Sequence, residues 1–94
     1  MTEATDDSPY QVLFAPAAER QLGKRRADDA ARLRRAILGL AFQPRPPQVS
    51  RIADTRYLRL RIGDLRVIYV VMDDQRRVVI TRIAKRSERT YRRL

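Results

Sequence analysis

The stretch YLRLRIGDLRVIYVVM, residues 57–72, predicts a β-hairpin. Its first half alternates aliphatic residues with tyrosine or arginine, which is the period of a strand buried on one face only. Its second half, residues 65–72, is rich in the β-branched and aromatic residues that strands prefer. Between the halves stands Gly63-Asp64, and glycine at the first loop position favours a two-residue type II′ turn.

Aligning the strands on this turn predicts which side chains face each other. The expected cross-strand pairs are Ile62 with Leu65, Arg61 with Arg66, Leu60 with Val67, Arg59 with Ile68, and Leu58 with Tyr69. Because successive side chains point to opposite faces, Arg59, Arg61 and Arg66 share one face and most of the aliphatic residues share the other. Directly opposed like charges destabilise a sheet, so the Arg61–Arg66 pair suggests a face that holds an anion.

The composition limits the chain to a few classes of protein. Its 94 residues suffice for one domain, and we expect a disordered acidic tail over residues 1–8 and a single domain over residues 9–94. With no cysteine there are no disulfides or thiolate metal sites, and with no histidine the commonest general base is missing. The start of the chain does not resemble a signal peptide and no apolar run could span a membrane, so we expect a cytoplasmic protein.

The charge is large and unevenly distributed. The formal net charge is +10, from 21 Lys+Arg against 11 Asp+Glu. Residues 1–50 carry 8 basic and 6 acidic residues, whereas residues 51–94 carry 13 basic and 5 acidic. Solubility and a coding preference for arginine explain the total but not this asymmetry. The sheet-forming half therefore attracts polyanions or an acidic protein partner.

The rest of the pattern predicts an α+β fold, in which an N-terminal strand and a two-helix hairpin precede a mostly antiparallel sheet of three to four strands. We expect a strand over residues 10–14, helices over residues 17–24 and 27–42, an irregular connector over residues 49–56, and a last strand over residues 77–84. The predicted core comprises Leu13, Leu22, Leu33, Ile37, Leu40, Leu58, Leu60, Val67 and Tyr69.

A three-residue loop at residues 73–75 sets the expected register of the last strand. It pairs Val70 with Val78, Ile68 with Ile80, and Arg66 with Arg82. The same alternation adds Arg82 and Arg86 to the arginine face, and a helical turn opened by Ser87 is expected to follow.

The residue types point to chemistry without a cofactor. There is no glycine-rich phosphate loop, zinc motif or nucleophilic triad, and the acidic residues do not cluster, so we expect no metal and no cofactor. Arginines can stabilise charge on a phosphate in the transition state, and RNA supplies its own nucleophile, the 2′-hydroxyl. Tyr91 either packs the terminal segment or stacks on a base and transfers a proton.

Two motifs resemble the RelE/ParE toxin superfamily of bacterial toxin–antitoxin systems. The first is RLRIGDLRVIY in the hairpin, and the second is KRSERTYR near the end of the chain. The segments FAPAAERQLGKR and QPRPP are also similar to the family, so the resemblance covers roughly residues 10–94. It implies a RelE-like fold.

The resemblance also implies an activity and roles for particular residues. The RelE branch cleaves messenger RNA in the ribosomal A site without metal, leaving a 2′,3′-cyclic phosphate and a 5′-hydroxyl, whereas the ParE branch inhibits DNA gyrase. Arg66, Arg86 and Tyr91 match the family's catalytic positions: contact with the scissile phosphate, stabilisation of the transition state, and stacking with proton transfer. The expected RNA-binding residues are Arg59, Arg61, Arg82 and Lys85.

Some positions depart from the family pattern, and the branch stays open. Arg59 and Tyr57 stand where members carry lysines, and Lys85 stands where many carry histidine. Thr90 lengthens the spacing between Arg86 and Tyr91. The leading hypothesis is a ribosome-dependent mRNA endoribonuclease. The alternatives are a gyrase inhibitor or an inactive homologue that acts as corepressor with its antitoxin.

The resemblance also implies the partners. They are an acidic, helical or partly disordered antitoxin, the ribosome and mRNA, and operator DNA that is bound through the antitoxin.

Overall fold

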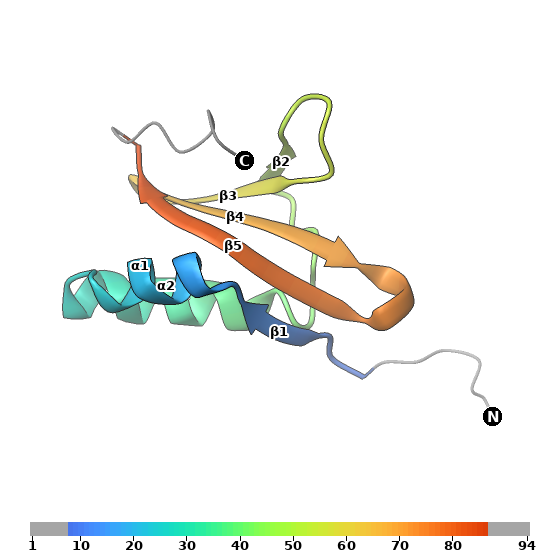
Figure 1. Cartoon of the computed structure of the whole chain (residues 1–94), viewed down its shortest axis with the longest axis horizontal. Helices are drawn as coiled ribbons and strands as arrows, with labels where there is room; N and C mark the ends of the chain where they lie inside the picture. Colours follow the sequence, from blue (N-terminus) through green and yellow to red (C-terminus); the bar gives the residue numbers. More distant parts are fainter. Residues whose placement is uncertain (1–7, 87–94) are drawn as a thin grey trace.

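The computed structural model describes residues 8–86, in which two helices cover one face of a five-stranded sheet (Figure 1). In chain order the elements are β1 (Gln11–Phe14), α1 (Pro16–Gly23), α2 (Ala27–Gly39), β2 (Val49–Arg51), β3 (Leu58–Ile62), β4 (Leu65–Met72), a 3₁₀ turn (Asp73–Gln75) and β5 (Arg77–Lys85). The strand order is β1-β5-β4-β3-β2, with β1 parallel to β5 and all other neighbours antiparallel. The predicted α+β class is confirmed. We call the sheet face opposite the helices, which carries Arg66, Ile68 and Val70 of β4, the open face.

The central hairpin has the predicted register. All five expected pairs are present, from Ile62↔Leu65 at the turn to Leu58↔Tyr69, and Arg61 lies directly opposite Arg66. The φ angle of Gly63 is +62°, whereas that of Asp64 is negative. A positive φ at the first loop position alone is the requirement of a type II′ turn.

The core lies between the helices and the sheet. Eight of the nine predicted core residues are buried, and the exception is Leu13, which is half-buried. Leu13 pairs with Val79 of β5, so its side chain points to the open face, while the alternate residues Val12 and Phe14 pack against the core. On the helices, Leu33 and Ile37 of α2 are almost completely buried, as their helical spacing predicts.

Two segments differ from the prediction. The helix expected over residues 27–42 ends at Gly39, because the next amides bond to carbonyls three residues back and tighten the chain into a turn. The connector expected over residues 49–56 contains β2, which pairs with β3 although only three residues long. The loop before β2 is anchored by the Tyr69 hydroxyl, which donates to the Pro44 carbonyl at 2.7 Å.

The predicted register of the last strand is wrong. The turn is one residue longer than expected, because Arg76 adopts φ +50° after the 3₁₀ turn, and Val71 rather than Val70 pairs with Val78. A β-bulge between Ile68 and Tyr69 then shifts the pairing by one more residue. The two shifts restore the alternation, so Arg82 lies on the open face as expected, opposite Ile68 instead of Arg66.

One side chain of α1 and one from the connection that follows it bind the edge of β5. Pairing with β1 ends at Ile80, so within residues 8–86 the later part of β5 pairs with β4 on one side and with no strand on the other. The Gln21 Oε1 atom accepts the Ile83 amide at 2.7 Å, and the Arg25 Nη2 group donates to the Ile83 carbonyl at 3.2 Å. Helix α1 therefore holds the end of β5 in place, which matters because Arg86 follows that end.

At the opposite end of the sheet, Asp73 joins three segments. Its carboxylate accepts both ends of the Arg45 guanidinium, at 3.2 and 2.8 Å, and the Tyr10 hydroxyl at 2.6 Å. The Arg76 guanidinium lies 4.6 Å from the centre of the Tyr10 ring, a cation–π contact. Arg45 and Arg76, at this end of the sheet, therefore stabilise the fold through contacts with Asp73 and Tyr10.

This cluster predicts a specific loss of stability in acid. Hydrogen bonds from Arg45 and Tyr10 lower the pKa of Asp73 from 3.8 to about 2. A carboxyl with a depressed folded-state pKa stabilises the protein above its unfolded pKa, and this contribution is lost as the pH falls through the folded value. Asp73→Asn should lower the melting temperature at neutral pH, and the difference from wild type should shrink as the pH falls from about 4 towards 2.

Asp74→Asn is the matched control, since this neighbouring carboxylate is exposed and has no ion pair within residues 8–86. Thermal melts of the two variants at several pH values measure the effect. A constant difference between Asp73→Asn and wild type at every pH would contradict the assignment.

Candidate functional site

Three arginines meet where the β3–β4 hairpin turns. Arg61, Arg66 and Arg86 line a pocket of about 400 Å³ together with Gly63 and Asp64. The first two come from the opposed strands β3 and β4. Arg86 is brought to the turn by its own amide, which donates to the Asp64 carbonyl at 2.7 Å. The pocket is called the arginine pocket below.

Backbone carbonyls hold Arg66 in the arginine pocket. Its side chain is buried, with the residue only 8% exposed, and its Nη1 group donates to the Leu65 carbonyl at 3.2 Å and more weakly to the Gly63 carbonyl at 3.5 Å. Within residues 8–86 its Nε and Nη2 groups have no partner. A guanidinium that is already oriented loses less entropy when it binds a ligand through its remaining donors.

Within residues 8–86, no ion pair neutralises the charge of the three arginines in this pocket. No carboxylate of residues 8–86 forms an ion pair with Arg61, Arg66 or Arg86, although Asp64 lines the same pocket. Arg45, at the other end of the sheet, is fully paired with Asp73. A buried, unpaired cation is costly, and neighbouring cations repel one another. An anion with several oxygens, such as a phosphate, would accept from all three guanidinium groups.

The basic surface continues along the open face. Arg59 and Arg82 lie on either side of Ile68, in the row next to Arg61 and Arg66. The Arg59 Nε and Nη2 groups donate to the Ser50 hydroxyl of β2 at 3.3 and 3.1 Å. Both arginines therefore lie beside the arginine pocket on the open face and are not part of its lining.

The other two predicted site residues, Lys85 and Tyr91, are not placed with these arginines. Lys85 pairs with Leu65, so alternation places it on the helix-covered side of the sheet rather than on the open face. Tyr91 and the helical turn expected from Ser87 lie outside the described residues. The arginine pocket is thus formed by three of the seven predicted site residues, Arg61, Arg66 and Arg86.

The amino-acid sequence matches one protein family over most of its length. The family model for the ParE toxin of type II toxin–antitoxin systems matches residues 12–90. The chain belongs to the RelE/ParE toxin family. It is therefore the toxin of a type II toxin–antitoxin system. Its first motif lies on the β3–β4 hairpin, and its second begins at Lys85, the last residue of β5. Among curated proteins, no sequence matches this toxin.

Solved structures of RelE toxins share the fold. A RelBE toxin–antitoxin complex from Mycobacterium tuberculosis matches with a TM-score of 0.73 at 28% identity, over 88% of this toxin and 100% of that chain. A RelE–RelB complex from Pyrococcus horikoshii matches with a TM-score of 0.76 at 23% identity, over 85% and 98%. The intact Escherichia coli RelBE complex matches with a TM-score of 0.74 at 18% identity, over 85% and 99%.

The toxin also has features at the site that sequence reasoning missed. The Gly63-Asp64 turn itself contributes to the pocket wall. On its other side, the Arg32 guanidinium of α2 lies so close that a Cβ atom added to Gly63 would be 2.6 Å from Nη2. Arg32 is not one of the buried residues of α2, and no local signal in the sequence indicates that the hairpin turn packs against it.

Two glycines of the toxin should respond oppositely to the same substitution. Gly63→Ala forces an L-residue into a positive φ and should cost about 1–2 kcal/mol, with Arg32 moving aside. Gly39→Ala adds a methyl group in open space at the end of α2 and should gain about 0.5–1 kcal/mol. Urea unfolding of both variants measures whether the free energy of unfolding falls or rises. Equal effects would show that the positive φ at Gly63 is not maintained.

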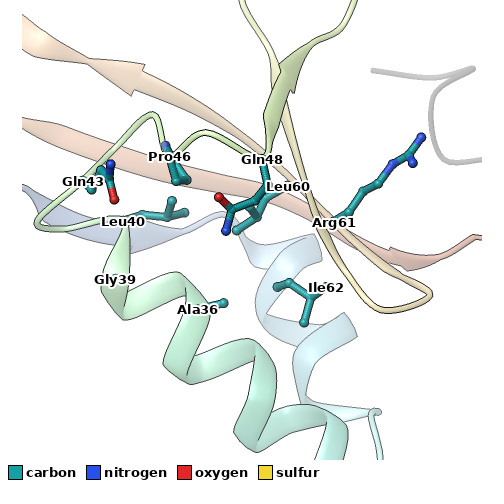
Figure 2. Close-up of a pocket in the computed structure, with 9 residues that line it drawn as sticks. All are labelled: Ala36, Gly39, Leu40, Gln43, Pro46, Gln48, Leu60, Arg61 and Ile62. Carbon is teal, nitrogen blue, oxygen red and sulfur yellow. The ribbon is translucent and has the colours of Figure 1, made fainter.

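A second pocket of about 180 Å³ lies on the helix side, between α2 and β3 (Figure 2). It is lined by Ala36, Gly39, Leu40, Gln43, Pro46, Gln48, Leu60, Arg61 and Ile62. In Figure 2 the Arg61 guanidinium points away from this pocket, so only its aliphatic stem contributes. The pocket is largely apolar and offers an anion no cationic group. None of the helices within residues 8–86 is long and apolar enough to cross a membrane.

Proposed function

We propose that this toxin is a ribosome-dependent mRNA endoribonuclease that inhibits translation in the cytoplasm. One observation carries the proposal: three guanidinium groups converge in the arginine pocket, and no carboxylate of residues 8–86 pairs with them. A phosphodiester with developing negative charge is the ligand that such a pocket would stabilise best. The similarity in fold to RelE toxins agrees with it.

The proposed reaction uses the nucleophile of the RNA. The 2′-oxygen loses its proton and attacks the adjacent phosphorus, the bond from phosphorus to the 5′-oxygen breaks, and the leaving oxygen takes up a proton. The products are a 2′,3′-cyclic phosphate and a 5′-hydroxyl. Arg66 and Arg86 would hold the non-bridging oxygens, whose charge increases in the transition state. The protein supplies position and charge, and needs no cofactor.

The proton transfers of this reaction require groups other than the pocket arginines. The pKa of arginine is above 12, so none of the pocket arginines is a useful general base. We assign this role, together with stacking on a base, to Tyr91. Arg61 and Arg86 share the pocket with Arg66, while Arg59 and Arg82 would contact flanking phosphates along the open face. Lys85 would contact RNA only from outside the pocket.

The partner that controls this toxin is expected to be an acidic antitoxin. Three of the structures with the same fold are toxin–antitoxin complexes. A net charge of +10 favours an acidic segment, which would neutralise the open face. We propose that the complex binds operator DNA through the DNA-binding part of the antitoxin.

The alternative is inhibition of DNA gyrase, and the family model that matches is the ParE one. In that case the arginine pocket would bind a protein or DNA surface without cleaving RNA. The ParE branch lacks the nuclease residues, whereas this toxin has Arg66 and Arg86, and this difference favours the nuclease.

Two parallel assays test the proposal. Purified toxin is incubated with ribosomes carrying a defined mRNA, and the cut sites and their 5′ ends are mapped. A supercoiling assay with gyrase is run at the same toxin concentrations. We expect cleavage with 5′-hydroxyl ends and unchanged supercoiling. Intact mRNA together with inhibited supercoiling would establish the gyrase alternative instead.

A further inference from the structure

We propose that Arg32 of α2 forms a second phosphate subsite, separated from the arginine pocket only by the Gly63-Asp64 turn. The inference rests on the proposed function, because it identifies single-stranded RNA as the ligand that spans both subsites. The pocket would hold one phosphate of the strand and Arg32 a neighbouring one.

The first observation is the position of Arg32 against the turn. Its Nη2 atom lies 2.6 Å from where a Cβ atom of Gly63 would be, and its Nη1 and Cζ atoms would lie 3.7 and 3.6 Å from the same point. The guanidinium thus packs against the Gly63 backbone. From the other side, the Arg66 Nη1 group donates to the Gly63 carbonyl at 3.5 Å. A single glycine therefore separates the two cationic groups.

The second observation is that both residues of the turn are exposed, so a strand that leaves the arginine pocket can reach the turn from solvent. Gly63 and Asp64 are both exposed, and Gly63 has no side chain. The space that a Cβ atom of Gly63 would take is occupied by the Arg32 guanidinium, so a ligand that crosses the turn would meet this cation there. The nearest side chain to such a ligand would be Arg32 itself.

The third observation is that Arg32 is oriented but only weakly neutralised. Its Nη1 group lies 3.5 Å from the Asp29 Oδ1 atom, an i,i+3 pair within α2. The Arg32 side chain is 46% exposed, whereas that of Asp29 is 18% exposed. A partly exposed pair of this kind contributes little energy, so an anionic ligand competes easily for the guanidinium.

Binding of an RNA that cannot be cleaved tests this subsite apart from catalysis. The probe is a fluorescent 2′-O-methyl oligonucleotide of about six nucleotides, and a mononucleotide with one phosphate serves as the short ligand. Arg32→Ala should weaken oligonucleotide binding about tenfold at low salt, the effect of one charge-assisted contact, and should lower the salt slope by about one phosphate. Affinity for the mononucleotide should not change.

Arg35→Ala is the matched control, because Arg35 is an exposed arginine on the same helix and none of the three atoms nearest to the Gly63 Cβ position belongs to it. The salt dependence of oligonucleotide binding should change less in Arg35→Ala than in Arg32→Ala. Asp29→Asn removes the competing carboxylate and should preserve or strengthen oligonucleotide binding. Melting temperatures of all variants confirm that they are folded.

The outcomes separate this inference from the proposed function. If Arg32→Ala and Arg35→Ala weaken binding equally, or if Arg32→Ala also weakens mononucleotide binding, the second subsite is wrong while mRNA cleavage can still stand. If the wild-type toxin cleaves no mRNA on the ribosome but binds the oligonucleotide in an Arg32-dependent way, the subsite stands and the nuclease assignment fails. If the wild-type toxin does not bind the oligonucleotide, the subsite is overturned.

Discussion

Arg66→Ala is expected to reduce ribosome-dependent mRNA cleavage about 10²- to 10³-fold, which is the usual cost of removing one group that stabilises transition-state charge. Arg66 is the residue that the fold holds most firmly in the arginine pocket, because two carbonyls orient its guanidinium and it is only 8% exposed. The rate of cleavage at a mapped site, measured in a single turnover, gives the effect directly.

Folding and function can be separated in this experiment. Arg66 has no carboxylate partner within residues 8–86 and lies directly opposite Arg61, so its removal relieves repulsion. The melting temperature of Arg66→Ala should therefore not fall far below that of the wild type. Arg66→Lys keeps the charge but loses the planar fork of donors, and should recover only part of the activity.

Arg77→Ala is the matched control, since Arg77 pairs with Met72 on the same face at the other end of the sheet and is exposed. It should cleave at close to the wild-type rate. If Arg66→Ala is fully active, or if Arg77→Ala loses as much activity, then the arginine pocket is not where the reaction occurs.

Leu33→Ala should lower the free energy of unfolding by about 3 kcal/mol, a typical cost for a leucine in a closely packed core. Leu33 is 0% exposed between α2 and the sheet. A loss of this size is a large fraction of the stability of a small domain. Urea unfolding followed by circular dichroism measures it.

Leu38→Ala is the same chemical change five residues further along α2, where the leucine is 63% exposed. It should change the stability by no more than about 0.5 kcal/mol. If the two variants are destabilised equally, α2 does not present the face to the sheet that the structure assigns to it.

The hairpin shows how far sequence reasoning reaches. Both strands have a clear period of two, and Gly63 permits a turn that sets their register without help from the rest of the chain. The opposition of Arg61 and Arg66 follows from that register alone. The buried face of α2 is predictable for the same reason, because its apolar residues recur with the helical period.

The register of β5 shows where such reasoning fails. Its pairing depends on a left-handed residue at Arg76 and on a bulge beside Ile68, and neither has a sequence signal. Arg82 was assigned to the correct face only because the two shifts add up to two residues, which leaves the alternation unchanged. Lys85 lies on the face opposite to Arg66, as the alternation requires in either register.

By itself, the sequence determined every element except β2, the central hairpin, the excess of arginine near its turn and the family. These properties depend on periodicity, turn chemistry and composition, which are local. Only the tertiary structure decided that Arg86 reaches the turn through the Asp64 carbonyl and that Arg32 packs against Gly63 from α2. Contacts between residues distant in the chain depend on how the layers pack, and no local pattern specifies them.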